Sequence, residues 1–392
     1  MSATANTSTI QNKGPRIFSR EAVLLGCFIL VIGLLIFTAF VSRMYHKQIH
    51  TLADEWFGQG EASFKDGDVK TALTDYRNAL VYSPGNARFQ FHLALALAAA
   101  GRDDEARSYL TNLLSESPGS GEINLALARI AARKGLMPEA LRYYHSAIYG
   151  EFETDPITLR WEIRRELCQY LLDRGTVNQA VPEIMALASN TPADDVEKLK
   201  VAADLLNRAK LWGRALELFR TVLAKSKEDK AALLGAARSA FELGRYRVAA
   251  EYLEQLPPQD RSDPETSSML AMAQRVQVVD PFVAGLSLAT KAQRVSSAMS
   301  MAKTRLQECA QENGQSLTAT PPRTELQISF AKSAEAGLDW SSVSLQRHPD
   351  SMDEAMSVAF EMENAAAGVC GEPEGEDRAL WLLGLSRGAK VQ

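Results

Sequence analysis

The chain has 392 residues, of which 46% are hydrophobic and 23% are charged, and its formal net charge at pH 7 is −5. This length is typical of one or two folded regions with appendages. The slightly acidic balance argues against a general nucleic-acid binder, which needs excess basic residues to neutralise phosphates. Alanine and leucine are abundant and β-branched runs are few, which favours an all-α fold.

The N-terminus is a polar segment followed by a long apolar one. Residues 1–20 are rich in Ser, Thr and Asn, which predicts a disordered tail. Residues 22–41 are almost continuously apolar and uncharged, long enough to cross the ~30 Å hydrocarbon core of a bilayer as a helix. A cleaved signal peptide would have a shorter apolar core and small residues at its cleavage site. We therefore expect a retained transmembrane helix over residues 21–42 and a juxtamembrane linker over residues 43–52.

The charges that flank this apolar segment predict its orientation. Three basic residues precede it and two follow it: Lys13, Arg16 and Arg20, then Arg43 and Lys47. Because the more basic flank of a membrane helix tends to stay in the cytoplasm, we expect the rest of the chain outside the cytoplasm. In a bacterium that compartment is the periplasm.

A 34-residue unit over residues 53–86 has the features of two short antiparallel helices. Its apolar positions include Trp56, Tyr76 and Ala79, and Gly67 marks the turn between the helices. Three landmark positions recur at the same interval further along the chain: Gly67, Gly101 and Gly135; Ala72, Ala106 and Ala140; Pro84 and Pro118. One such helix pair cannot bury its apolar stripe alone, so the repeats must stack.

The later units keep this register with two irregularities. The fourth unit starts six residues late, after Gly150–Asp155, and Lys210 replaces the turn glycine of the fifth unit. A sixth unit follows, and the next helix starts at Pro264. We expect about six and a half repeats over residues 53–279.

These residues resemble the tetratricopeptide-repeat family, in its membrane-anchored bacterial form. The family pattern is W-x2-L-G-x2-Y, then A-x3-F, A and P, and several degenerate copies occur in fixed register over residues 53–278. The first copy departs from the pattern at Gln59 and Ser63. The resemblance implies an α-solenoid whose concave groove binds segments of other proteins.

The resemblance also implies candidate binding residues, because five positions of each first helix tend to line the groove in this family. On this chain the apolar candidates are Phe57, Phe64, Phe91 and Leu95. The basic candidates are Arg129, Arg133, Arg165, Lys200, Arg208 and Arg238. We expect the groove to bind a peptide segment that is apolar at one end and acidic at the other. The alternative is that interspersed acidic residues pair with these bases on a solvated surface.

The C-terminal region, residues 280–392, is predicted to be a helical cap over the last repeat, because the open end of a solenoid needs covering. A long amphipathic helical stretch that runs to Gln311 is expected first, followed by helices over residues 324–337, 350–369 and 379–385. An acidic turn is expected at residues 372–377. An alternative is a separate helical domain that forms a homodimer.

Two cysteines, Cys309 and Cys370, each lie at the end of a predicted helix. In an oxidising compartment they are a candidate disulfide that would cross-link about 60 residues, worth on the order of 4 kcal/mol. The alternative is two free thiols in a cytosolic domain.

The sequence contains no phosphate loop, metal-ligand cluster or nucleophile elbow, so we expect no enzyme activity, cofactor or metal. The leading interpretation is a scaffold, anchored in the bilayer through residues 22–41, that binds segments of membrane or envelope proteins. Two alternatives are a self-assembling structural component of the envelope and an assembly chaperone for cytochromes or polysaccharide-export machinery. The sequence identifies neither the partner nor the pathway.

Overall fold

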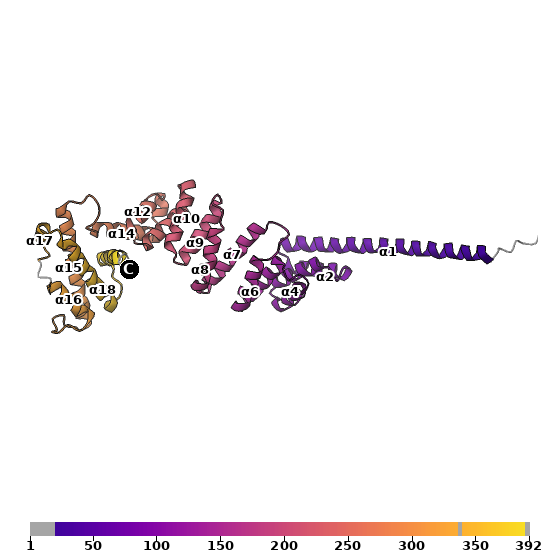
Figure 1. The fold of residues 1–392 in the computed structure, drawn as a ribbon, viewed down its shortest axis with the longest axis horizontal. Coiled ribbons are helices and arrows are strands. Elements are labelled where there is room, and N and C mark those ends of the chain that lie inside the picture. Colours follow the sequence, from indigo (N-terminus) through magenta and orange to yellow (C-terminus); the bar gives the residue numbers. More distant parts are fainter. Residues whose placement is uncertain (1–19, 336–338, 389–392) are drawn as a thin grey trace, which may run out of the picture. The chain divides into compact units, whose positions relative to one another are not determined.

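The computed structural model describes residues 20–335 and 339–388 (Figure 1). In these ranges every regular element is a helix, and the one strand-like contact is an isolated bridge between Ser120 and Glu151. The all-α prediction is therefore confirmed. The expected tail over residues 1–20 lies almost wholly outside the described residues.

The chain forms two compact units, residues 1–156 and 157–392. The first contains α1 (Arg20–Lys65), α2 (Val69–Tyr82), α3 (Ala87–Ala99), α4 (Asp103–Glu116), α5 (Gly121–Arg133) and α6 (Met137–Ile148). At the boundary α7 (Pro156–Asp173) begins, and the second unit continues with α8 (Val177–Ser189), α9 (Val196–Arg208), α10 (Trp212–Lys225), α11 (Lys230–Glu242), α12 (Tyr246–Glu254), α13 (Pro258–Arg261) and α14 (Pro264–Val279). Its last helices are α15 (Leu288–Glu312), α16 (Glu325–Glu335), α17 (Ser342–Arg347), α18 (Ser351–Cys370) and α19 (Gly375–Gly388).

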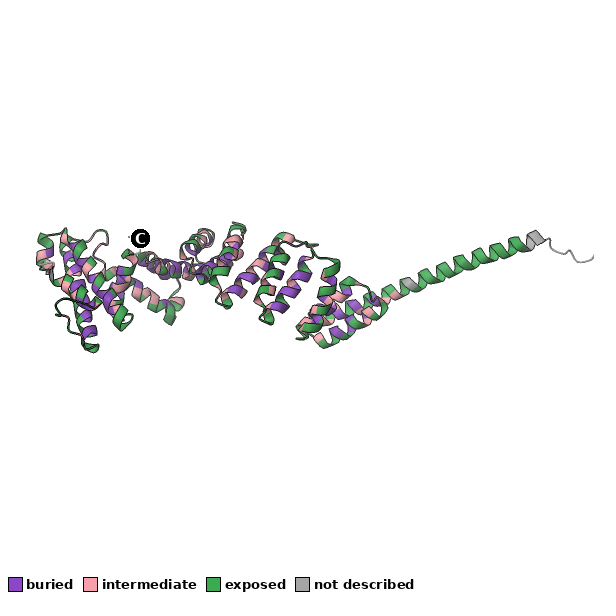
Figure 2. Cartoon of the chain, turned by 60° about the horizontal axis from the view of Figure 1, so that its bottom comes forward, coloured by how far each residue is buried: buried purple, intermediate pink, exposed green. Residues whose placement is uncertain are grey.

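Helix α1 joins the apolar segment to the first repeat without a break. Residues 43–52, expected as a linker, are the middle of this 46-residue helix. The side chains of residues 24–41 are exposed, whereas Ala53, Phe57 and Gly60 are buried against the repeat (Figure 2). By length and hydropathy, α1 carries the one segment among the described residues that could cross a membrane.

The turns within the helix pairs share one backbone conformation. Glycines with φ between 68° and 82° occupy the turn in five pairs: Gly67, Gly101, Gly135, Gly175 and Gly244. Lys210 adopts φ 61° at the corresponding position of the fifth pair. The fifth repeat therefore keeps the turn geometry, although the side chain of Lys210 disfavours the left-handed region.

The insertion before the fourth repeat folds back onto the turn that precedes α5. The backbone N–H of Gly121 donates to the carbonyl of Glu151 at 2.9 Å, and the N–H of Glu151 donates to the carbonyl of Gly119 at 2.8 Å. A Cβ on Gly121 would lie 2.2 Å from the Phe152 ring, so only glycine allows that ring to pack there. The extra residues thus pack onto the first unit.

The C-terminal helices share their core with the last repeats. Tyr246 of α12 and Val276 of α14 belong to the same buried cluster as Val295 of α15 and Leu380 of α19. The core is therefore continuous across residues 279 and 280, where the sequence interpretation placed a boundary. Sequence analysis missed the short α17, and α19 begins at Gly375, inside the expected acidic turn.

Helix α19 is held by polar contacts to the sixth repeat and to the segment that follows α14. The Tyr246 hydroxyl donates to the carbonyl of Leu382 at 3.3 Å. Arg387 pairs with Asp280 at 3.1 Å and lies 3.9 Å from the centre of the Phe282 ring. These contacts make the chain's last described helix a cover for the repeats.

Two glycines of α1 provide a matched test of the repeat packing. A Cβ on Gly60 would lie 2.8 Å from carbons of the buried Tyr76 ring, whereas a Cβ on Gly58 would meet nothing within 4 Å. We expect Gly60→Ala to lower the free energy of unfolding by about 1–3 kcal/mol through overpacking. Gly58→Ala should raise it by up to about 1 kcal/mol, because alanine favours a helix interior. Urea unfolding of both variants checks this; equal effects would contradict the packing.

Candidate functional site

Phe57 is part of the core between the first two repeats. It is 4% exposed, and its ring stacks on Phe89 of α3 with centroids 4.7 Å apart. The rings of Tyr76 and His92 lie 5.6 and 5.0 Å away, and the Arg88 guanidinium lies 4.4 Å from the Phe57 centroid. The prediction that Phe57 offers a free surface to a ligand is therefore wrong, because the next first helix covers its ring.

The other apolar candidates, Phe64, Phe91 and Leu95, are partly buried and keep some accessible surface. Close to them, one carboxylate oxygen of Glu61 accepts a hydrogen bond from the Tyr76 hydroxyl at 2.5 Å and lies 2.6 Å from His92 Nδ1. Burial and the Glu61 carboxylate raise the pKa of Tyr76, so its hydroxyl stays protonated. This part of the first unit offers an aromatic surface with a polar cluster.

Most of the basic candidates are engaged by carboxylates. The pairs are Arg133 with Asp103 at 2.5 Å, Arg165 with Glu162 at 2.7 Å, Lys200 with Glu197 at 2.8 Å and Asp229 at 2.9 Å, Arg208 with Asp173 at 2.6 Å, and Arg238 with Glu265. Arg129 is exposed on α5. An acidic ligand would have to compete with these internal carboxylates, although each exposed pair contributes only about 0–1 kcal/mol.

Two of the basic candidates line one cleft in the second unit. The cleft has a volume of about 580 Å³ and lies over α9 and α11, with Gln169 of α7 at its edge. Lys200 and Arg238 are in its wall, but Arg165 and Arg208 are not. Hydrogen bonds to Glu197 and Asp229 raise the pKa of Lys200, so this lysine is charged and already paired.

The floor of the cleft is built by a polar contact between neighbouring repeats. Asn207 is 6% exposed, and its Nδ2 donates to the carbonyl of Gly235 at 3.1 Å. Its Oδ1 accepts from the Ser239 hydroxyl at 2.7 Å. A Cβ on Gly235 would lie 2.2 Å from the Phe219 ring, so glycine permits the close packing of α10 and α11. The base of the cleft is therefore closely packed and hydrogen-bonded, which sequence spacing alone did not indicate.

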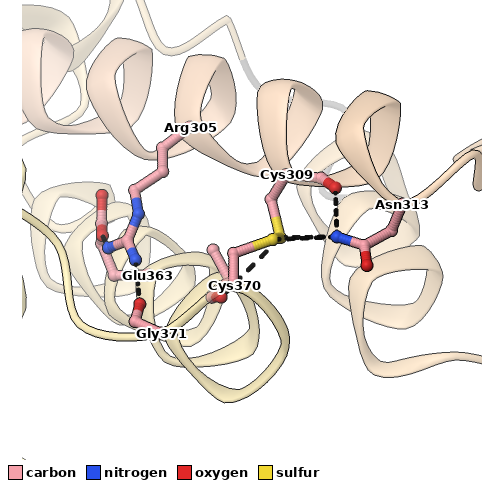
Figure 3. The surroundings of a disulfide bond; sticks show 7 residues. Arg305, Cys309, Asn313, Glu363, Cys370 and Gly371 are labelled. Carbon is pink, nitrogen blue, oxygen red and sulfur yellow. Dashed lines mark hydrogen bonds and ion pairs between the residues drawn. A yellow bond between two sulfur atoms is a disulfide. The ribbon is translucent and has the colours of Figure 1, made fainter.

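The C-terminal helices are cross-linked by a disulfide between Cys309 of α15 and Cys370 of α18, with Cα atoms 6.0 Å apart (Figure 3). Next to it, Arg305 donates to Glu363 at 2.5 Å and to the carbonyl of Gly371 at 2.8 Å. Glu363 is completely buried, and burial raises its pKa to about 7 although Arg305 opposes this shift. Among the described residues, no group of three or more metal-ligating side chains is placed to hold an ion.

Comparison with family models gives matches to tetratricopeptide-repeat models over residues 57–121, 97–149 and 206–273. No curated protein matches the chain.

Three similar solved structures illustrate the fold comparisons. PilW, described as a widely conserved type IV pilus biogenesis factor, is 19% identical with a TM-score of 0.41, over 56% of this chain and 98% of PilW. PilF of Pseudomonas aeruginosa is 17% identical with a TM-score of 0.41, over 57% and 99% of the two chains. The C-terminal part of a tetratricopeptide-repeat protein from Cytophaga hutchinsonii is 14% identical with a TM-score of 0.45, over 61% and 92%.

We predict that the disulfide stabilises the C-terminal helices. Replacing both bonded cysteines by alanine should lower their free energy of unfolding by about 4 kcal/mol, since the bond closes a loop between residues 61 apart in sequence. Urea unfolding with and without reductant measures the loss, and reductant should not affect the double variant. Thiol labelling of the unfolded, unreduced chain should count two of the four cysteines; a count of four would contradict the bond.

The buried Glu363 makes stability depend on pH. Because its pKa is raised to about 7, the folded chain keeps a proton that the unfolded chain loses above about pH 4.5. The stabilisation of the folded chain by the protonated Glu363 is complete below about pH 4.5 and is lost as pH rises to about 7. The free energy of unfolding should fall by up to about 3 kcal/mol over this range. The difference in unfolding free energy between wild type and Glu363→Gln should therefore change across this range. Glu354→Gln, at an exposed position of the same helix without an ion pair among the described residues, should run parallel to wild type; parallel curves for both variants would contradict the shift.

Proposed function

Because this chain belongs to the tetratricopeptide-repeat family, we propose that it is a membrane-anchored scaffold that binds segments of other proteins along its first helices. Repeats of this family generally bind proteins or peptides and are generally not enzymes. The cleft over α9 and α11 is the candidate binding surface in the second unit, because the predicted groove residues Lys200 and Arg238 line it.

One observation carries the proposed anchoring: the apolar side chains of α1 are not covered by any part of the chain that the structure describes. Its large side chains from Leu24 to Val41 are between 39% and 69% exposed. At about 1.5 Å per residue these 18 residues extend about 27 Å, close to the thickness of the hydrocarbon core. Insertion into a bilayer would remove this apolar surface from water.

The continuity of α1 supports a partner that is itself at the membrane. About 12 residues of uninterrupted helix, or about 18 Å, separate Val41 from the first buried residue of the repeat, Ala53. If residues 22–41 cross a bilayer, the first repeat would lie near its surface. Membrane or envelope proteins therefore present the most accessible binding segments.

The disulfide supports an orientation in which the repeats lie outside the cytoplasm. Disulfides form and persist in oxidising compartments and are rare in the cytosol. The bond between Cys309 and Cys370 therefore agrees with the orientation predicted from the basic flank of the apolar segment. In a bacterium the repeats would be periplasmic.

Photo-crosslinking of the full chain in its own membranes tests this function. A crosslinking residue at Leu234, in the cleft, should capture another membrane-associated protein, whereas one at Glu217, an exposed position of α10, should not. The chain should also resist alkaline extraction from membranes. Equal capture at both positions would contradict cleft binding, and release of the chain would contradict anchoring. Adducts between copies of the chain alone would favour the self-assembly alternative.

A further inference from the structure

The net charge around the α9–α11 cleft differs from the positive charge that its basic residues alone suggest. The two bases in its wall, Lys200 and Arg238, are paired with Glu197, Asp229 and Glu265. Together with Asp204, which also lines the cleft, these groups comprise four carboxylates and two bases. The local surface is therefore acidic, although its bases first suggested the opposite.

Asp204 is the carboxylate that remains available. It lies on α9 one turn from both Lys200 and Arg208, but these bases are bound by Glu197, Asp229 and Asp173 instead. Asp204 is exposed and makes no hydrogen bond or ion pair with the part of the chain that the structure describes. An opposite charge at this position could approach it without displacing an existing partner.

The rest of the cleft wall suits an aliphatic chain. Val201 of α9 lines the cleft together with Ala231 and Leu234 of α11, and all three keep accessible surface. Lysine and arginine combine an apolar stem with a charged end, and they bury the stem while the charge stays in water. A glutamate has a shorter stem and would bring a like charge to Asp204.

We propose that this cleft recognises a basic side chain, Lys or Arg, in the bound segment, with its stem on the aliphatic wall and its charge on Asp204. This inference rests on the proposed function and specifies the chemistry of the ligand at one position. The sequence analysis expected an acidic ligand at this place. We infer a basic one, because carboxylates already pair with Lys200 and Arg238.

The test uses the full chain in detergent micelles and four synthetic peptides of the form Ala-Leu-Ala-X-Ala-Leu-Ala, with X as Lys, Arg, Gln or Glu. Each peptide carries a terminal photo-crosslinker, and the adducts are mapped by mass spectrometry. At low salt we expect Lys and Arg peptides to label α9 and α11 up to about fivefold more than the Gln peptide, and the Glu peptide less. Salt at 0.5 M should reduce the ratio.

Two substitutions separate the charge effect from a loss of folding. Asp204→Asn keeps the shape of an exposed side chain, so it should fold normally by circular dichroism and bring the Lys to Gln labelling ratio close to one. Glu354→Gln, at an exposed position of α18, should leave the ratio unchanged. Labelling of the cleft without preference for a basic residue, or a preference that survives Asp204→Asn, would overturn this inference alone. No labelling of the cleft by any peptide would contradict both it and the proposed cleft binding.

Discussion

The structure depends on one constraint: a pair of short helices cannot shelter its apolar stripe without a neighbouring pair. Phe57 of the first pair is buried against Phe89 and His92 of the second pair as well as Tyr76 of its own. In the same way, Gly235 of α11 leaves room for Phe219 of α10. Each pair contacts mainly its neighbours. The stability of the repeats is therefore approximately the sum of contributions from each helix pair and from its contacts with adjacent pairs.

The two ends of such an array need different solutions, because each terminal pair lacks one neighbour. At the N-terminal end, α1 contains both the apolar segment and the first helix of the first repeat. The position of the first repeat therefore depends on the surroundings of the apolar segment. At the C-terminal end, the chain folds back and α19 packs on the sixth repeat through Tyr246. This cover relies on contacts between residues far apart in sequence. The disulfide and the buried pair of Arg305 with Glu363 join α15 to α18 within the same C-terminal helices.

The polar surface follows from the same stacking. Neighbouring first helices bring bases next to carboxylates of the adjacent repeat, as for Arg208 with Asp173 and Arg238 with Glu265. These pairs neutralise charges that would otherwise be offered to a ligand. Under the proposed function, what remains for recognition is a small set of unpaired groups and the shape of the cleft between repeats.

The sequence by itself determined the all-α fold, the repeat interval, the apolar helix and the candidate cysteine pair. These features are readable because a helix pair is a local unit whose glycine turn and apolar period lie within 34 residues. Even Lys210, which breaks the glycine pattern, occupies the turn that the interval predicted. The tertiary structure alone decided which candidate residues are accessible and which charges are free. The partners of Arg133, Lys200, Arg208 and Arg238 lie 27 to 35 residues away, across the boundary between one repeat and the next. Periodicity places side chains on a face of their own helix, but their neighbours on the next helix depend on how the pairs stack.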